Sequence, residues 1–282
     1  MYNGERYLRV ALESMLTQTL GDFELIICDN ASTDGTEGIC REYAARDPRV
    51  QYHRLPSNVG AANNFRRTFE LSRGPYFKWI ASDDYCAPAF LERCKCVLDE
   101  HQEVVLCTSK VNIVDAEGRL IEPYPDPQGL NQERASERLM VSRNQDGWCN
   151  AVYGLIRSET LRRTAVMGNY VGSDMVLLGE ISLYGHFAEV PDYLLFRRFH
   201  PGAYSHEVSL DKMRAFYMPS KKRATALVYR NWRHLFEYWR AVRRAPLPAL
   251  ERLRLSVYIL RMAWWRKGAL MTEIAAALRN NG

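Results

Sequence analysis

Hydrophobic and polar positions follow two different periods along the first 110 residues of the chain. Residues 5–18 carry apolar side chains three and four positions apart, which predicts an amphipathic helix, and the short apolar run at 23–28 predicts a buried strand. The alternation then continues with an expected helix to about residue 46, a strand at 50–54, a helix at 61–72, a strand at 76–81, a helix at 88–100 and a strand at 104–107. Strands that alternate with helices are typical of a parallel-type sheet, so we predict an α/β fold.

The pattern becomes less regular after residue 110. Residues 111–121 predict a hairpin whose turn contains Glu117 and Gly118. The further elements that we expect are helices near 132–141, 158–166 and 174–184, and strands near 151–156, 187–190 and 193–199. From about residue 209 onward the pattern is helical, with an interruption at Pro246-Leu247-Pro248. We therefore predict two parts, an α/β domain at 1–205 and a basic helical C-terminal region at 206–282.

The chain begins at a turn, Met1-Tyr2-Asn3-Gly4, with no strand before its first expected helix. In a nucleotide-binding α/β unit, the first strand normally precedes this turn and forms a central part of the sheet. We therefore expect the first strand to be missing from this sequence. Two explanations stay open, namely a start codon assigned too far downstream and a sheet that carries a gap.

The composition sets broad limits on the class of protein. With 282 residues, of which 47% are hydrophobic and 25% charged, the chain can bury a core as one large domain or two unequal ones. No stretch approaches the roughly 18 uninterrupted apolar residues of a membrane span, and no signal peptide opens the chain. The seven cysteines, an odd number without a C-x-x-C pair, predict reduced thiols in a cytosolic protein.

The charge is unevenly distributed along the chain. Residues 205–282 contain 16 Lys and Arg against 5 Asp and Glu, although the net charge of the whole chain is only +5. The remainder is therefore weakly acidic. A basic region on such a body indicates an anionic partner, and the charge alone leaves phospholipid and nucleic acid both open.

The expected strand at 76–81 leads directly into Ser82-Asp83-Asp84. Two neighbouring carboxylates repel each other, so their position at the end of a strand favours a bound cation. Ligands of open α/β sheets bind outside the carboxyl ends of the strands, and Mg²⁺ is commonly held by one or two carboxylates together with phosphates. A solvated turn is the alternative, because Asp-Asp pairs are also common in loops.

Several short motifs occur in a characteristic order. They are Tyr2-Asn3-Gly4-Glu5-Arg6-Tyr7-Leu8, Gln18-Thr19, the runs from Asp22 to Ile27 and from Asp29 to Thr36, Asn58-Val59-Gly60, Gly74-Pro75-Tyr76, Ser82-Asp83-Asp84, Gly172-Ser173-Asp174 and Arg197-Arg198-Phe199-His200. Over roughly residues 1–205, this series resembles family 2 of the inverting glycosyltransferases. The resemblance implies the GT-A fold, a mixed sheet flanked by helices, with a nucleotide-sugar-binding half at 1–110 and an acceptor-binding half at 111–205.

The resemblance also implies roles for residues at the donor site. Asp84 matches the metal-binding position of the family, so a divalent cation, Mn²⁺ or Mg²⁺, is expected as cofactor. Asp83 matches the carboxylate that faces the donor ribose and the metal, and Tyr2 matches an aromatic residue that packs against the base. Asp29 and Asn30 match an acidic pair that hydrogen-bonds the base, with Asn30 in place of an acid, which leaves the nucleotide preference open. Without the resemblance, the stretch that begins at Asp29 is equally a helix cap and turn.

Inversion by direct displacement requires a base that takes the proton of the acceptor hydroxyl. By the resemblance, Asp174 is the expected catalytic base. An aspartate before a helical run also serves as an N-cap, which is the alternative role for this residue. Glu180, on the same expected helix, is a weaker substitute.

His200 follows an arginine-rich strand. By the resemblance it completes the metal shell or contacts the diphosphate, whereas the alternative is a surface histidine beside Pro201. Arg197 and Arg198 can face the phosphates, and we expect one of them to point away because neighbouring residues of a strand alternate in direction.

Trp148, Asn150 and Tyr153 lie where the resemblance implies an acceptor loop. Aromatic side chains in such a loop suit stacking on the face of a sugar ring, and packing in the core is the alternative. No Q-x-x-R-W pattern, which marks processive members of the family, occurs in the sequence. Transfer of a single sugar is therefore the better interpretation.

The C-terminal region lies outside the resemblance. Residues 250–270 combine apolar positions, paired tryptophans and arginines, a composition typical of helices that lie in a membrane interface. A helix that packs on the body or on another subunit is the alternative. We thus expect a cytoplasmic protein, with peripheral contact at the inner face of the membrane as one option and with no nucleic acid as partner.

The leading hypothesis is a metal-dependent glycosyltransferase that uses a nucleoside-diphosphate sugar and a carbohydrate or lipid-linked acceptor in the synthesis of a surface polysaccharide or glycolipid. A nucleotidyltransferase is a second hypothesis, but residues 1–22 lack the glycine-rich phosphate loop that it requires. A catalytically inactive scaffold is a third, and it rests on the absent first strand.

Overall fold

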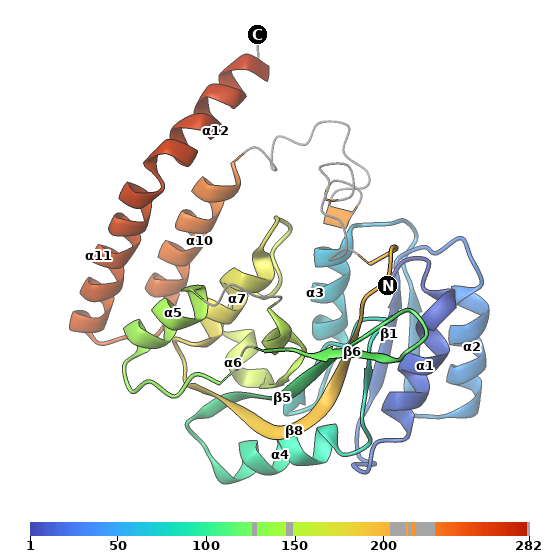
Figure 1. Ribbon diagram of the computed structural model, residues 1–282. Helices are drawn as coiled ribbons and strands as arrows, with labels where there is room; N and C mark the ends of the chain where they lie inside the picture. Colours follow the sequence, from blue (N-terminus) through green and yellow to red (C-terminus); the bar gives the residue numbers. More distant parts are fainter. Residues whose placement is uncertain (126–128, 145–148, 204–212, 214–215, 218–228, 281–282) are drawn as a thin grey trace.

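The computed structural model describes residues 1–125, 129–144, 149–203, 213, 216–217 and 229–280 (Figure 1). Its elements up to residue 100 are α1 (Glu5–Leu16), β1 (Leu25–Asp29), α2 (Thr36–Arg46), β2 (Val50–Arg54), α3 (Ala61–Leu71), β3 (Tyr76–Phe77), β4 (Tyr85–Cys86) and α4 (Phe90–Glu100). The later elements are β5 (Val104–Val114), β6 (Leu120–Pro123), α5 (Ala135–Asn144), the 3₁₀ helix η1 (Asn150–Tyr153), β7 (Leu155–Arg157), α6 (Ser158–Arg162), α7 (Ser173–Ile181), β8 (His186–Arg198), α10 (Arg230–Arg244), α11 (Ala249–Trp265) and α12 (Lys267–Asn280).

The described strands form two sheets that share no strand. β1 and β2 are parallel, with Leu25 opposite Val50. The larger sheet has the order β3-β7-β5-β8-β4, and β6 pairs with β5. β5 and β8 are parallel, whereas the other pairs of this sheet are antiparallel. The fold is therefore α/β with a mixed sheet flanked by helices, as predicted, and β5 and β8 curve together through its centre (Figure 1).

Two strands differ from the sequence prediction. The strand expected at 76–81 ends at Phe77. The ammonium of the next residue, Lys78, donates a hydrogen bond to the carbonyl of Tyr153. The strand expected at 151–156 starts as η1 and becomes extended only in β7. In both places an apolar run predicted burial correctly but did not determine the backbone conformation.

A third difference joins two predicted strands into one. The segments at 187–190 and 193–199 belong to the single long strand β8. Pro191 interrupts the apolar pattern and has no amide hydrogen to donate, and the register between β5 and β8 shifts at this point. Proline is tolerated at such an irregularity, so β8 continues past it.

The central sheet buries apolar side chains on both of its faces. Val104 and Val105 are successive residues of β5, and they enter different clusters of the core. The first cluster lies among α1, α2, α4, β1, β5 and β8, and the second among α3, α6, α7, β5 and β7. Because a strand covered on both faces has no solvated side, β5 is almost entirely apolar or small in its side chains.

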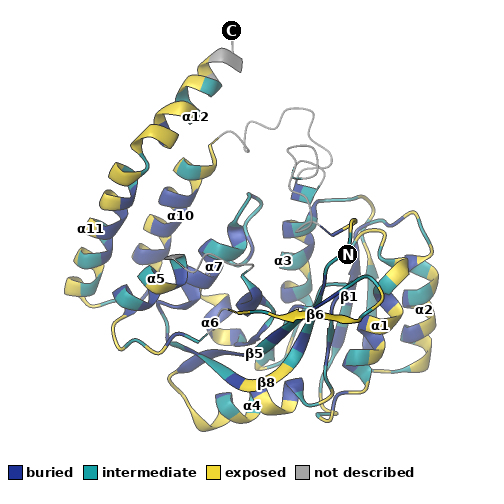
Figure 2. Ribbon diagram, in the orientation of Figure 1, coloured by how far each residue is buried: buried dark blue, intermediate teal, exposed yellow. Residues whose placement is uncertain are grey.

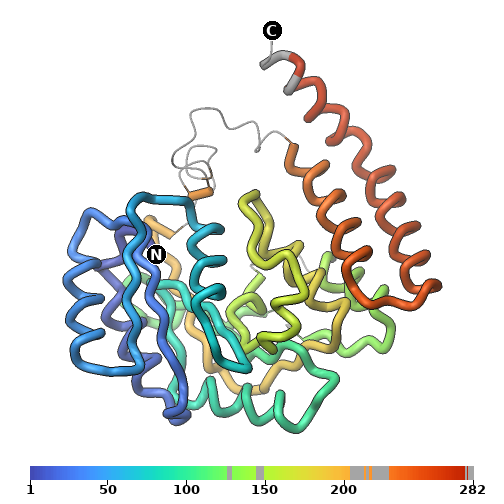
Figure 3. The backbone as a smooth tube through the Cα atoms, turned by 180° about the vertical axis from the view of Figure 1, so that it is seen from behind, coloured from blue at the N-terminus to red at the C-terminus, as the bar shows by residue number. Residues whose placement is uncertain are grey.

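Helices α10, α11 and α12 form the C-terminal part (Figure 3). α10 packs on α7, α11 packs on α5, and α12 contacts α10 and α11. Tyr238 of α10 is 1% exposed, and it lies against Gly179 of α7, where a Cβ atom would come within 2.8 Å of the tyrosine ring. Small residues at such a crossing allow two helices to approach closely. α10 is thereby joined to the same helix, α7, that carries Asp174 in its first turn.

A buried ion pair also joins α7 to α10. The Glu180 carboxylate, which is almost fully buried, contacts the Arg244 guanidinium and accepts a hydrogen bond of 3.0 Å from the amide of Ala165. Burial raises the pKa of Glu180 above its ordinary value, while the amide of Ala165 and the charge of Arg244 act in the opposite direction. Removal of the arginine would therefore leave a buried carboxylate without its cation.

We expect Arg244→Met to lower the free energy of unfolding by about 3 kcal/mol, because a buried charge without its partner is costly. Glu180→Gln combined with Arg244→Met should recover most of this loss, since the double variant has no buried charge. Denaturant unfolding at neutral pH measures both changes.

Arg243→Met is the matched control, because the Arg243 side chain lies over the exposed ring of Trp239 and should change stability by no more than about 0.5 kcal/mol. Equal effects of the substitutions at positions 243 and 244 would show that the ion pair does not contribute to stability.

Candidate active site

Three loops that are far apart in the sequence meet beside the N-terminus. The amide of Asn3 donates to the Ser32 hydroxyl at 2.9 Å, and the amide of Gly4 donates to the Thr36 hydroxyl at 2.9 Å. A Cβ atom on Gly4 would lie 3.1 Å from the hydroxyl oxygen of Ser82, so the first loop also touches the segment that carries the two aspartates. These contacts bring residues 1–5, 29–36 and 82–84 to one place.

The predicted base-binding residues lie in the first two of these loops. Tyr2 is 48% exposed and is thus accessible to a ligand. Asp29 is fully buried, and its carboxylate accepts hydrogen bonds from the amide of Ser32 and the hydroxyl of Tyr52, both at 2.9 Å. Burial by itself raises the pKa of Asp29, but these hydrogen bonds and the guanidinium of Arg54 hold it below its ordinary value. Asp29 is therefore an ionised residue that organises the loop.

Asn30 is also buried, and both the nitrogen and the oxygen of its side-chain amide form hydrogen bonds. Its amide nitrogen donates to the side-chain oxygen of Asn58 at 2.8 Å, and its oxygen accepts a hydrogen bond of 2.9 Å from the amide of Val59. Asn30 thereby holds the Asn58-Val59-Gly60 loop against the end of β1. An acid at this position could not donate to Asn58, which explains why an amide fits here.

Asp83 lies against His200, which follows the end of β8. The Nε2 atom of His200 lies 3.1 Å from a carboxylate oxygen of Asp83. The His200 ring contacts the ring of Tyr7, with centroids 4.8 Å apart, and the hydroxyl of Tyr7 is buried without a hydrogen-bond partner in the described structure. The sequence pointed to Asp83 and His200 separately, and the structure brings them together.

Asp84 is buried next to the arginines at the end of β8. Its carboxylate accepts a hydrogen bond of 2.9 Å from the amide of Arg198 and lies 3.7 Å from Nε of Arg197. Burial and, secondly, the charge of Asp83 raise the pKa of Asp84 to about 6, although Arg197, the amide of Arg198 and Lys78 act in the opposite direction. The surrounding cations therefore only partly balance the pair of aspartates.

The guanidinium of Arg197 joins this pair to the predicted acceptor loop. It donates a hydrogen bond of 2.7 Å to the side-chain oxygen of Asn150 and lies over the ring of Tyr153, 5.5 Å from its centroid. Asn150 is fully buried, and its amide nitrogen has no hydrogen-bond partner in the described structure. Trp148, the third residue predicted for the acceptor loop, lies outside the described residues. Arg198 points the other way, toward the carbonyls of residues 115 and 116, so the two arginines alternate as expected.

Asp174 lies in the first turn of α7, and its carboxylate accepts a hydrogen bond of 2.9 Å from the amide of Met175. The pKa of Tyr153 is raised, mainly by burial and further by the charges of Asp84, Asp83 and Asp174. All three carboxylates therefore act electrostatically on the same buried hydroxyl. Glu180, the substitute considered for the base, is instead engaged by Arg244 on α10.

α10 supports the turn that precedes Asp174. Gly172 has a φ of +77°, a left-handed conformation, and a Cβ atom there would lie 2.8 Å from the ring of His234. Nε2 of His234 donates a hydrogen bond of 2.7 Å to the carbonyl of Val171, and burial lowers the pKa of His234, which favours the neutral ring. The C-terminal region thus fixes the start of α7.

The donor set at the aspartate pair fits a hard divalent cation. Asp83 and Asp84 supply adjacent carboxylates, Asp83 is partly accessible, and the raised pKa of Asp84 indicates a need for further positive charge. Mg²⁺ and Mn²⁺ are commonly bound by one or two carboxylates and completed by phosphate oxygens and water. No group of three or more His, Cys, Asp or Glu side chains is arranged to hold a metal by itself in the described part of the chain.

The family of this chain is shown by comparison with known proteins. The profile described as Glycosyl transferase family 2 matches residues 1–163, more than half of the chain. The chain belongs to glycosyltransferase family 2. The chondroitin synthase of Escherichia coli is 37% identical over 124 residues, which cover 43% of this chain and 17% of that protein. The chain spans less than half the length of the curated relatives that it matches.

Solved structures of glycosyltransferases share the fold. S. aureus TarS 1–349 in complex with UDP-GlcNAc has a TM-score of 0.65 at 15% identity, over 95% of this chain and 72% of that one. The mannosyltransferase PcManGT from Pyrobaculum calidifontis, in complex with GDP-Man and Mn²⁺, has a TM-score of 0.52 at 17% identity, over 100% and 74%. The predicted GT-A fold with a helical C-terminal region is thus confirmed.

The sequence motifs did not assign a role to several residues that lie in or beside the site of this family 2 member. Lys78 lies near Asp84, and its only signal was a lysine within an apolar run. Tyr7 contacts His200, but it occupies an ordinary position of an amphipathic helix. His234 lies in the C-terminal region, far from the motifs, and no spacing rule connects it with Gly172.

We expect Gly172→Ala to lower the free energy of unfolding by about 1–3 kcal/mol, because the new methyl group meets His234 in a left-handed backbone conformation. Gly268→Ala is the matched control, since a Cβ atom there has no neighbour within 4 Å and the residue lies in α12. The control should be neutral or should stabilise by up to about 1 kcal/mol. Thermal unfolding compares the two variants, and equal effects would contradict the close packing of His234 on Gly172.

Proposed function

We propose that this chain transfers a sugar from a nucleoside-diphosphate donor to an acceptor hydroxyl with inversion of the anomeric centre. The observation that carries the proposal is the convergence of the Tyr2 loop, the Asp29 loop and the Asp83-Asp84 pair. Because the chain belongs to glycosyltransferase family 2, we assign sugar transfer to this arrangement of residues.

The donor nucleotide is proposed to bind across the interlocked first and second loops. Tyr2 is exposed and can pack against the base, and Asp83 can approach the ribose. Asp29 and Asn30 have their side-chain atoms engaged within the protein, so we assign them the role of shaping the base pocket as well as contacting it. The complex of TarS with UDP-GlcNAc makes a uridine diphosphate sugar the first donor to test.

Asp84 and Asp83, with His200 beside them, are proposed to hold Mn²⁺ or Mg²⁺ together with the donor diphosphate. When bound, the ion would neutralise the charge that develops on the leaving diphosphate. The mannosyltransferase neighbour solved with GDP-Man and Mn²⁺ supports this choice of ion. Arg197, which already lies between Asp84 and Asn150, is in a position to hold the carboxylate in place before the donor binds.

Asp174 is proposed as the catalytic base. The acceptor oxygen attacks the anomeric carbon, the bond from that carbon to the diphosphate oxygen breaks, and the hydroxyl proton passes to the Asp174 carboxylate. Asn150, Tyr153 and Trp148 are proposed to contact the acceptor. The unpartnered amide nitrogen of Asn150 supports this role, because a buried donor without a partner gains a hydrogen bond when a sugar hydroxyl arrives.

The acceptor is proposed to be a carbohydrate or a lipid-linked glycan in the synthesis of a surface polysaccharide. A relative named chondroitin synthase and another named as a minor teichoic acid biosynthesis protein support this class. We further propose that one sugar is added per encounter, and the lack of a Q-x-x-R-W pattern in the sequence supports this proposal. All seven cysteines are free, which supports action in a reducing compartment such as the cytoplasm.

Turnover of a panel of nucleotide sugars with Mn²⁺ or Mg²⁺ tests the proposal. One donor should be hydrolysed or transferred, and EDTA should abolish the reaction. Asp174→Asn should lower kcat by about 10²–10⁴, the range typical of general base catalysis. Asp84→Asn should lower kcat/KM by about a hundredfold or more, because the site loses charge for the cation and the diphosphate.

Asp192→Asn is the matched control, since this aspartate is exposed and pairs with Arg93 on the surface. It should retain full activity. If every donor of the panel stays intact in the presence of metal, this chain acts as an inactive scaffold. If Asp174→Asn is fully active, another residue is the base.

A further inference from the structure

A continuous row of exposed apolar side chains runs along the two last helices. On α11 the row occupies positions at i, i+3, i+7, i+10 and i+14, which form one stripe of a helix. Its members are Leu250, Leu253, Val257, Leu260 and Trp264, with exposures of 57%, 61%, 47%, 70% and 68%. At spacings of seven residues, Met271 and Leu278 extend the row along α12 with exposures of 63% and 71%. We call these seven residues the outer row.

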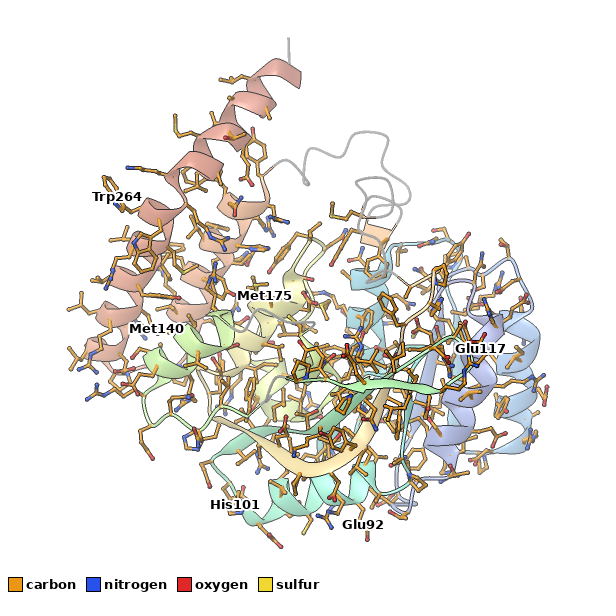
Figure 4. All side chains as sticks on the ribbon, viewed as in Figure 1. Glu92, His101, Glu117, Met140, Met175 and Trp264 are labelled. Atoms are coloured by element: carbon orange, nitrogen blue, oxygen red, sulfur yellow. The ribbon has the colours of Figure 1, made fainter. Side chains whose placement is uncertain are left out.

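The outer row faces away from the protein. The opposite stripe of α11, formed by Leu255, Tyr258, Ile259 and Met262, is buried in the core that α11 shares with α10 and α5. Figure 2 shows the free sides of α11 and α12 as exposed, and Figure 4 shows Trp264 directed away from the body. Scattered exposed apolar residues are normal, but an aligned row of this kind indicates an interaction surface.

Positive charge accompanies this row. Residues 230–280 contain 11 Lys and Arg against 3 Asp and Glu. Each of the three acids is engaged within the C-terminal helices: Glu237 with Arg233 and Arg240, Glu251 with Arg254, and Glu273 with the amide and side chain of Asn231. The C-terminal helices therefore carry a net positive charge that their own acids do not neutralise.

Two of these cations lie beside the tryptophans of the surface. The guanidinium of Arg261 lies 4.9 Å from the ring centroid of Trp265, and the ammonium of Lys267 lies 4.2 Å from that of Trp264. Trp265 itself is 62% exposed. Tryptophan with arginine or lysine around an aliphatic row is the composition of helices that lie at the level of lipid headgroups.

We propose that α11 and α12 lie flat on an anionic membrane, with the outer row and Trp265 in the headgroup region and Arg261 and Lys267 on lipid phosphates. In the part of the chain that the structure describes, no helix has the length and hydrophobicity needed to cross a bilayer. A second copy of the chain is a poorer partner for this surface. In a symmetric dimer the same cationic helices would face each other, with no free carboxylate in the outer row to pair with them.

The outer row is connected to the candidate active site through two successive helix contacts. α11 packs on α10, and α10 packs on α7, which carries Asp174. Binding to a membrane would therefore hold the acceptor side of the site close to the lipid surface. This consequence rests on the proposed function, whereas membrane binding itself does not.

Co-sedimentation of the full chain with vesicles tests the inference. One set of vesicles contains phosphatidylcholine alone, and the other contains phosphatidylcholine with phosphatidylglycerol. The chain should bind the anionic vesicles, and raised salt should weaken binding. Two double variants, Trp264→Ser with Trp265→Ser and Arg261→Glu with Lys267→Glu, should each weaken binding about tenfold or more, because both the apolar and the ionic contribution are needed.

Matched controls separate this surface from general effects of charge and hydrophobicity. Leu120→Ser with Ile121→Ser removes two exposed apolar side chains of β6, and Arg73→Glu with Arg163→Glu reverses two exposed charges of the body. Both control pairs should bind as the original chain does. All positions changed are exposed, so folding should be retained, which circular dichroism verifies.

Absence of binding to anionic vesicles, or equal binding to neutral ones, would overturn the inference. So would sedimentation of the chain as a dimer that the tryptophan variant converts to a monomer, since the outer row would then be an interface between copies. Nucleotide-sugar turnover in the absence of vesicles is measured separately. A failure of the proposed reaction is therefore distinct from a failure of membrane binding.

Discussion

The position of two adjacent carboxylates, one of them buried, is the constraint on which the rest of the site depends. Asp84 cannot be buried beside Asp83 without nearby positive charge, because an unpaired charge in the interior is strongly unfavourable. The end of β8 supplies that charge through Arg197, and the amide of Arg198 donates a hydrogen bond to the same carboxylate. The antiparallel pairing of β4 with β8, in which Tyr85 lies opposite Phe196, places these groups beside the aspartates.

The same constraint explains why the site is built from distant segments. The first loop interlocks with the loop after β1 and touches Ser82, so the surface next to Asp83 is formed by the chain start. On the other side, Arg197 reaches Asn150 and Tyr153, and α10 fixes the turn before Asp174. The helical C-terminal region therefore contributes to the geometry of the site as well as to the exposed outer row.

The sequence predicted the family and the fold class better than it predicted the local backbone conformation. The motifs pointed to Asp83, Asp84 and His200, and these residues lie close together because the aspartates directly precede β4, His200 follows β8, and β4 and β8 are antiparallel neighbours. An apolar run predicts burial but not strand pairing. The strand predicted at 76–81 is therefore longer than β3, and the interruption at Pro191 predicts two strands where the structure has the single strand β8. Contacts such as His234 on Gly172 depend on the packing of helices far apart in the sequence, and no local pattern reports them.

Calorimetric titration of a panel of nucleoside diphosphates, with and without Mn²⁺, tests most directly whether the aspartate pair is a site for a cation and a diphosphate together. One nucleotide should bind about tenfold or more tightly when Mn²⁺ is present, because the ion would bridge the phosphates and the carboxylates. The effect of Mn²⁺ should disappear in Asp84→Asn, while the weak binding without metal persists. Equal affinities with and without Mn²⁺, or a metal effect that survives in Asp84→Asn, would contradict this account.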